Sequence, residues 1–153
     1  MAPAMQPDAY VILLLRQQEY DVARWLLIAQ QKISGFDTEW VEALFMAIQE
    51  PEYLGEAVQA VLRAEESGDM SALHLFGVWV YLDEVERAID AALALNRDRV
   101  SFNTEFLFAE ESSALRQHPR FGEIIRGIKL DHYWDYFGWP AMCQPQGTNI
   151  VCH

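Results

Sequence analysis

Apolar residues recur at three- and four-residue spacing from Asp8 to about Asn96, and this periodicity is the feature that most limits the fold. Residues at this spacing share one face of an α-helix, whereas a half-buried strand needs alternation, which hardly occurs before residue 100. Gly35, Pro51 and Gly68 interrupt the pattern at positions typical of helix ends or helix starts. The sequence therefore predicts an all-α fold with six helices in this stretch.

These breaks predict three antiparallel helical hairpins, at about residues 8–34, 37–67 and 69–96. Asp37 and Asp69 are the expected N-caps of the third and fifth helices. Asp83 and Glu86 have the spacing of a capping box at the start of the sixth helix. On the second helix, a stripe expected to face the core contains Val22, Trp25, Leu26, Ala29 and Ile33.

An alanine stands near the start of the second helix of each hairpin. Ala23, Ala57 and Ala88 are 34 and then 31 residues apart, close to the repeat length of tetratricopeptide proteins. A small side chain lets two antiparallel helices approach closely, and Gly77 is expected to serve the same purpose in the fifth helix. The sequence thus predicts tetratricopeptide-like (TPR-like) hairpins in a single domain over residues 1–153.

Beyond Asn96 the pattern breaks into shorter pieces, which we expect to form a capping tail over about residues 100–153. Asn103 is the expected cap of a short helix, and Pro119 should open another that ends near Ile128. Residues 132–139 are densely aromatic, and a terminal repeat must cover its exposed apolar face. The tail is therefore interpreted mainly as a cap, with a ligand or peptide pocket as the alternative.

The segments VYLDEVERAIDAALAL, LRQHPRFGEIIRGIKL and HYWDYFGWPAMC resemble the C-terminal ends of bacterial tetratricopeptide-containing regulators. Those regulators include winged-helix transcription factors and class III adenylate cyclases. The residues that match this family's closing pattern are Leu115, Arg116, Pro119, Arg120, Phe121, Leu130, Tyr133, Trp134, Gly138, Trp139, Pro140 and Cys143. The resemblance covers about residues 78–143.

This chain departs from the family at two points: Lys129 stands where a glycine is usual, and the segment between Gly138 and Pro140 is one residue shorter. The turn that follows the helix is expected to differ accordingly. The chain has no winged helix, cyclase domain or β-propeller. The resemblance therefore implies a regulatory accessory module that acts by contact with a partner.

The formal net charge of −12, with only 11 basic residues scattered along the chain, excludes the concentrated basic face that a nucleic-acid partner requires. The excess acid would instead attract a basic peptide or protein surface. No apolar run approaches the roughly 20 residues that cross a membrane, and the opening MAPAMQP lacks the basic start of a signal peptide. We expect a protein or peptide partner and no membrane insertion, and self-association stays open.

Candidate binding residues follow from repeat geometry, which places a concave surface along the first helix of each hairpin. The expected contact residues on that surface and in the tail are Tyr10, Arg16, Glu42, His74, Trp79, Tyr133, Trp134 and Trp139. Trp79 is of particular interest, because aromatic residues that the core does not need are common among binding hot spots. Its alternative role is packing against the tail.

Cys143 and Cys152 flank a segment rich in proline and glycine, so both a disulfide and two free thiols are compatible with the sequence. The cytoplasm is the expected compartment, or the periplasm if the disulfide forms. A third alternative is a metal site built from both cysteines, His153 and His132, although this spacing matches no standard zinc motif.

No phosphate-binding glycine loop, nucleophile elbow or HExxH helix occurs, and the four histidines are dispersed. The sequence therefore predicts a non-enzymatic helical-repeat protein without a cofactor, which mediates protein–protein interaction in bacterial signal transduction. A small-molecule sensor that binds its ligand beneath the aromatic tail is the first alternative function. A metal-binding domain is the second.

Overall fold

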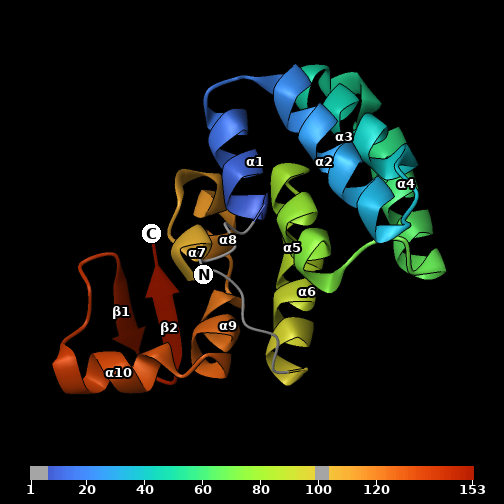
Figure 1. Ribbon diagram of the computed structural model, residues 1–153. Coiled ribbons are helices and arrows are strands. Elements are labelled where there is room, and N and C mark those ends of the chain that lie inside the picture. Colours follow the sequence, from blue (N-terminus) through green and yellow to red (C-terminus); the bar gives the residue numbers. More distant parts are fainter. Residues whose placement is uncertain (1–6, 99–103) are drawn as a thin grey trace, which may run out of the picture. The chain divides into compact units, whose positions relative to one another are not determined.

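A computed structural model describes residues 7–98 and 104–153 of the chain (Figure 1). The described residues are 72% helical and include one small two-stranded sheet, so the mainly helical class is confirmed. The chain divides into two compact units, unit 1 (Met1–His74) and unit 2 (Leu75–His153). That the whole chain is a single repeat domain stays a prediction.

Unit 1 consists of two helical hairpins followed by the start of a further helix. Its elements are α1 (Pro7–Arg16), α2 (Tyr20–Ser34), α3 (Glu39–Gln49), the 3-10 turn η1 (Pro51–Tyr53), α4 (Leu54–Ser67) and α5 (Ala72–Tyr81), which continues into unit 2. Helix α1 packs on α2, and α3 packs on α4 (Figure 1). Ala23 on α2 and Ala57 on α4 have no exposed surface, as expected where two helices approach closely.

Both glycine stops in unit 1 adopt the left-handed conformation that glycine tolerates best. Gly35 and Gly68 each have φ of 76° and end α2 and α4. After Gly35, the Phe36 amide donates to the Gln31 carbonyl at 2.9 Å, which satisfies one of the last carbonyls of the helix. These two helix ends are as the sequence predicts.

The predicted aspartate caps are wrong. Helix α3 begins at Glu39 with Thr38 as its N-cap and without a side-chain cap, while the Asp37 carboxylate accepts the neighbouring Thr38 amide at 2.8 Å. At α5 it is Ser71, not Asp69, whose hydroxyl accepts the His74 amide at 3.1 Å. Several polar side chains near a helix start compete for its free amides, and periodicity alone does not rank them.

Two turns of the chain have the same backbone conformation. One joins α1 to α2, and the other, 65 residues later, joins α5 to α6 (Val85–Arg97). Gln18 and Asp83 lie in the left-handed region with φ of 60° and 57°. In the first turn the Glu19 amide donates to the Leu14 carbonyl at 2.9 Å, and in the second the Glu84 amide donates to the Trp79 carbonyl at 3.0 Å. Asp83 is therefore a turn residue, and the capping box expected with Glu86 does not form, because α6 has Glu84 at its N-cap.

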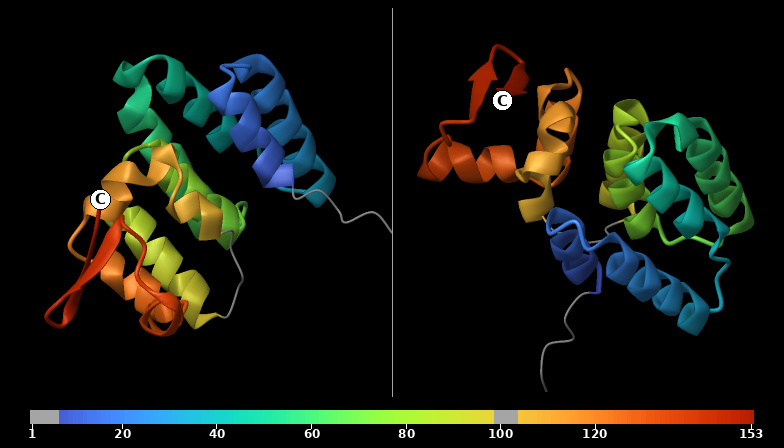
Figure 2. Two further views of the ribbon diagram at one scale, coloured as in Figure 1. Left: turned by 90° about the vertical axis from the view of Figure 1, so that its left-hand side faces the viewer. Right: turned by 90° about the horizontal axis from the view of Figure 1, so that it is seen from above.

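Unit 2 continues with short helices and a β-hairpin. Its later elements are α7 (Thr104–Leu107), the 3-10 turn η2 (Glu110–Ser112), α8 (Ser113–Gln117), α9 (Phe121–Gly127), α10 (Leu130–Phe137), β1 (Cys143–Gln146) and β2 (Asn149–Cys152). Helix α9 lies at the centre, against α6, α10 and β2 (Figure 2). Phe121, Ile124 and Ile125 on α9 have no exposed surface, and Ala88 of α6 has 1%. The Asn103 cap lies outside the described residues.

Lys129 is a non-glycine residue with a left-handed backbone conformation. This residue has φ of 61° and ψ of 26° and precedes α10 in the left-handed region, where glycine carries the least steric cost.

The β-hairpin is the element that the sequence did not predict. Its strands pair antiparallel, with Cys143 opposite Cys152 and Gln146 opposite Asn149, and Gly147 in the turn has φ of 61°. On β2 only Ile150 and Cys152 are buried, which is too short an alternation to identify a strand from sequence. In addition, β1 contains a proline, which is unusual in a strand. A Cβ on Gly122 of α9 would lie 3.2 Å from the Ile150 Cβ, so glycine permits the close approach of helix and hairpin.

Two predicted helix faces are wrong. Helix α2 buries Ala23, Leu27 and Gln31 instead of the predicted stripe, in which Trp25 is 69% and Ile33 87% exposed. At Gly77, a Cβ would meet no described atom within 4 Å, so the expected close approach at this glycine is not seen. Periodicity shows that apolar faces exist, but tertiary packing selects which of them is covered.

Candidate functional site

The predicted contact residues of unit 1 lie on three helices and have different neighbours. Tyr10 on α1 is 44% exposed, and Arg16 lies at the exposed end of the same helix. Glu42 on α3 accepts a hydrogen bond from Arg24 at 2.9 Å, and this bond raises the pKa of Arg24 above its ordinary value. His74 lies 3.0 Å from the Ser71 hydroxyl, and its ring centroid is 6.1 Å from that of Trp40. Glu42 and His74 thus take part in contacts within unit 1.

Trp79 is not an exposed contact residue, contrary to the sequence-based expectation. Its side chain is 2% exposed, and the Arg87 guanidinium lies 5.3 Å from its ring centroid. The correction has a simple reason: α5 is apolar on nearly every face, so its sequence does not show which face is covered. Trp79 belongs to the core.

The aromatic tail has an inward side formed by its two tryptophans. Trp134 is 7% exposed, with ring centroids 6.1 Å from Phe108 and 5.2 Å from Trp139. The Trp139 indole N–H donates to Asp135 at 2.9 Å, so its polar edge is satisfied. Trp134 thus fills the space beneath α10 that the sensor interpretation would give to a ligand.

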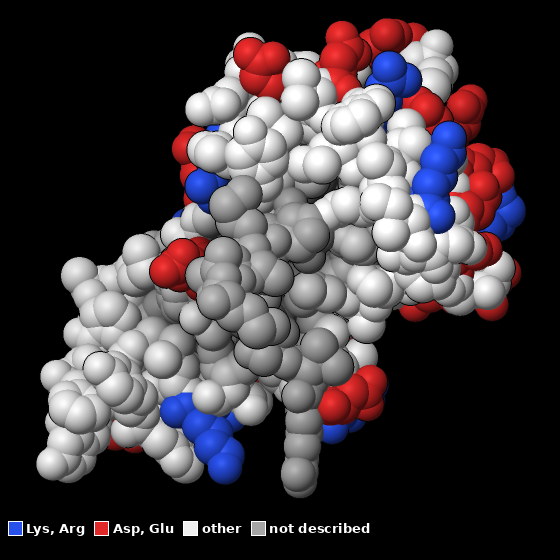
Figure 3. All heavy atoms as spheres, in the orientation of Figure 1, with Lys and Arg blue, Asp and Glu red and all other residues white. Residues whose placement is uncertain are grey.

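The other side of α10 is an exposed aromatic surface. Tyr133, Tyr136 and Phe137 are 55%, 82% and 66% exposed, and their rings contact one another at centroid distances of 4.5 and 4.7 Å. Mostly uncharged side chains cover this part of the face drawn in Figure 3. Tyr133 therefore stays a candidate contact residue, whereas Trp134 is structural.

A groove lies between α3, η1 and α4 in unit 1, with a volume of about 540 Å³. Glu39, Glu52 and Glu56 line it together with Arg63, and Arg63 is already bound to Glu39 at 2.7 Å. Acidic side chains gather over α3 and α4 in Figure 3. None of these lining residues was among the predicted contact residues; the spacing of Glu52 and Glu56, one helical turn apart, was the available signal.

An ion-pair cluster joins α6 to α9 in unit 2. Arg120 contacts Glu86, Asp90 and Glu123 at 3.0 to 3.2 Å, and hydrogen bonds to Glu123, Asp90 and Glu86, in that order of effect, raise the pKa of Arg120. His118 Nδ1 accepts the Arg120 amide at 3.2 Å, and its Nε2 lies 2.9 Å from Glu86. The charged side chains of this cluster thus pair with one another, and the pairs connect α6 to the start of α9.

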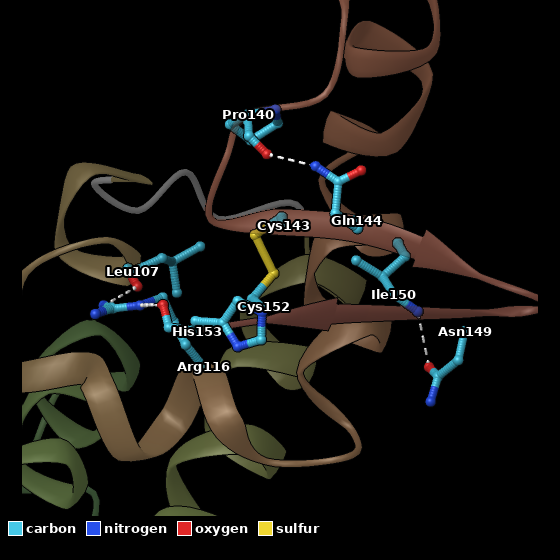
Figure 4. The surroundings of a disulfide bond; sticks show 9 residues. All are labelled: Leu107, Arg116, Pro140, Cys143, Gln144, Asn149, Ile150, Cys152 and His153. Carbon is cyan, nitrogen blue, oxygen red and sulfur yellow. Dashed lines mark hydrogen bonds between the residues drawn. A yellow bond between two sulfur atoms is a disulfide. The ribbon is translucent and has the colours of Figure 1, made fainter.

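Cys143 and Cys152 are joined by a disulfide in the structure (Figure 4). Both cysteines are buried, at 0% and 3% exposure. In the bridged state neither sulfur is a thiolate ligand, and no cluster of three metal-binding side chains occurs among the described residues. His132 on α10 is largely exposed, with its Nε2 3.9 Å from Asp131. The compartment stays undetermined.

Arg116, which the sequence identified only through the LR-x-x-PRF resemblance, attaches the end of the hairpin to the helices. It is 8% exposed, and its guanidinium donates to the carbonyls of His153 at 3.0 Å and Leu107 at 3.1 Å (Figure 4). It also donates to the carbonyl of Ala109 at 2.6 Å. Three backbone segments therefore meet at one buried cation. Its role is to position the hairpin.

Replacing both cysteines by alanine should lower the free energy of unfolding by about 2–3 kcal/mol, because the bridge closes a short loop in the unfolded chain. Urea denaturation with and without a thiol reductant checks this. The wild-type protein should lose the same amount on reduction, whereas the double variant should not respond. Equal midpoints for oxidised and reduced wild-type protein would show that the bridge does not contribute.

Among the described residues, no helix is long and apolar enough to cross a bilayer. Comparison with family models, curated proteins and solved structures gives no match to this chain.

Proposed function

We propose that this chain is a TPR-like helical-repeat module that binds a basic segment of a partner protein. Two hairpins with buried alanines and the identical turn 65 residues apart support a repeat origin for the helices. The resemblance of residues 78–143 supports a regulatory or sensory role in bacterial signal transduction. As a repeat module, the chain would work without catalysis or a cofactor.

The observation that carries this proposal is the acidic groove of α3, η1 and α4. Glu39 is neutralised by Arg63, but no ion pair of Glu52 or Glu56 is found among the described residues. Unit 1 holds 12 of the 23 acidic residues of the chain, against four basic ones. Two unpaired carboxylates in a concave, strongly acidic surface would attract and orient a lysine- or arginine-bearing segment.

The test uses a fluorescein-labelled amphipathic helical peptide with lysines on its polar face, titrated with the full chain. The Glu52→Gln/Glu56→Gln variant should bind this peptide about five- to thirtyfold more weakly than wild type, since each of the two exposed pairs contributes about 0.5–1 kcal/mol. Fluorescence anisotropy measures the Kd, and wild-type binding should weaken as salt is added.

The matched control is Glu65→Gln/Glu66→Gln, which removes two exposed charges from α4, the helix of Glu56, but outside the groove. This control should change the Kd by less than about twofold. If both double variants weaken binding equally, the attraction is a property of net charge and the groove is not the site. If wild type does not bind the peptide at low salt, the proposed partner class is wrong.

A further inference from the structure

Helix α2 presents an apolar stripe to solvent that the packing of unit 1 does not use. Val22, Trp25 and Ile33 are 47%, 69% and 87% exposed, and Ala29 is half-buried. Spacings of three and four residues place these side chains on one helix face. The buried residues Ala23, Leu27 and Gln31 occupy a different face of α2, so this helix is apolar on two sides.

The stripe is complementary to itself in the antiparallel orientation. Two residues of an antiparallel helix pair lie at the same height when their numbers add up to a constant, and a two-fold axis brings the same side of each helix together. With α2 centred near residue 27, the constant is 54, so Trp25 lies opposite Ala29 of the second copy, and Val22 lies within one residue of the level of its Ile33. A large ring thereby meets a small side chain, as close packing of two helices requires.

Charged residues beside the stripe also pair favourably in this antiparallel arrangement. Asp21 and Lys32 stand on one side of it, near the two ends of α2, and both are exposed. In the antiparallel pair Asp21 comes within one residue, about 1.5 Å along the axis, of the level of Lys32 in the second copy. The two-fold axis repeats this attraction, so two opposite-charge pairs would flank the apolar contact.

We propose that α2 is a homodimerisation surface, on which a second copy of this chain docks its own α2 in antiparallel orientation. This inference goes beyond the proposed peptide binding, because it assigns a different surface and a different partner. The 15-residue helix is about 22 Å long, so the contact is smaller than the roughly 800 Å² per partner of a standard interface. A dimer with a Kd on the order of micromolar is therefore expected.

Sedimentation velocity of the full chain over a range of micromolar concentrations tests this surface. Wild type should shift from monomer to dimer, and Trp25→Ser should weaken the dimer by at least about tenfold without unfolding the protein, because the ring is mostly exposed. Tyr136→Ser is the matched control, since it removes another exposed aromatic ring from unit 2 and should leave the dimer unchanged.

A charge exchange tests the register itself. Asp21→Lys and Lys32→Asp should each weaken the dimer about tenfold, because each creates two like-charge pairs. The combined variant restores opposite charges and should dimerise within about twofold of wild type, and an equimolar mixture of the two single variants should form heterodimers. Circular dichroism verifies that every variant keeps its helices.

Three results would overturn the proposal. A monomer at all concentrations would mean that no second copy binds, as expected if this face were covered within the chain. A dimer lost in Tyr136→Ser but kept in Trp25→Ser would place the interface elsewhere. If the combined charge variant dimerises no more strongly than the two single variants, the antiparallel register is wrong.

Discussion

Trp134→Ala should lower the free energy of unfolding by about 3–5 kcal/mol, the usual cost of removing a large buried aromatic side chain. The indole is 7% exposed and lies between Phe108 and Trp139, so its loss leaves a cavity beneath α10 that short, locally held helices cannot readily close. Urea denaturation followed by circular dichroism measures the change without depending on tryptophan fluorescence.

Tyr136→Ala on the same helix is the control for this prediction. Tyr136 is 82% exposed, so its loss should change the free energy of unfolding by less than about 0.5 kcal/mol. This contrast separates the structural side of α10 from the side available for contact. Similar losses in the two variants would mean that α10 does not have an inward and an outward face.

Arg116→Leu should cost about 3 kcal/mol, because leucine keeps the apolar stem but removes every donor. The carbonyls of Leu107, Ala109 and His153 would each lose their guanidinium partner; the bond to Leu107 is buried and the other two are partly buried. A buried acceptor without a partner costs about 1–3 kcal/mol, and a partly buried one costs less. Water that enters the space left by the guanidinium would bind some of these carbonyls and lower the total cost. The same urea experiment measures this loss.

Arg126→Leu is the matched control, since Arg126 on α9 also donates to a carbonyl of the hairpin, that of Thr148. Arg126 is exposed, and water can replace its single bond, so its loss should cost less than about 1 kcal/mol. The Cys143–Cys152 bond should also be reduced faster in Arg116→Leu than in Arg126→Leu, because the hairpin end is released. Equal effects would show that Arg116 does not hold the hairpin.

The candidate site was less predictable than the helices for an identifiable reason. The groove combines Glu39, Glu52 and Glu56 from three elements, and no local pattern relates the first of these to the others. The disulfide stayed open because a nine-residue separation permits a bridge but does not require one. Trp79 was placed wrongly, as an exposed contact residue, because α5 is apolar on nearly every face and its sequence does not show which face is covered.

By itself, the sequence determined what depends on local chemistry. Helical periodicity determined the class of the chain, and Gly35 and Gly68 ended their helices because glycine accepts positive φ without steric cost. Only tertiary structure decided the β-hairpin, the burial of Trp79 and the exposure of the α2 stripe. These depend on which of several apolar faces finds a partner, and that competition is settled by packing between segments far apart in the chain.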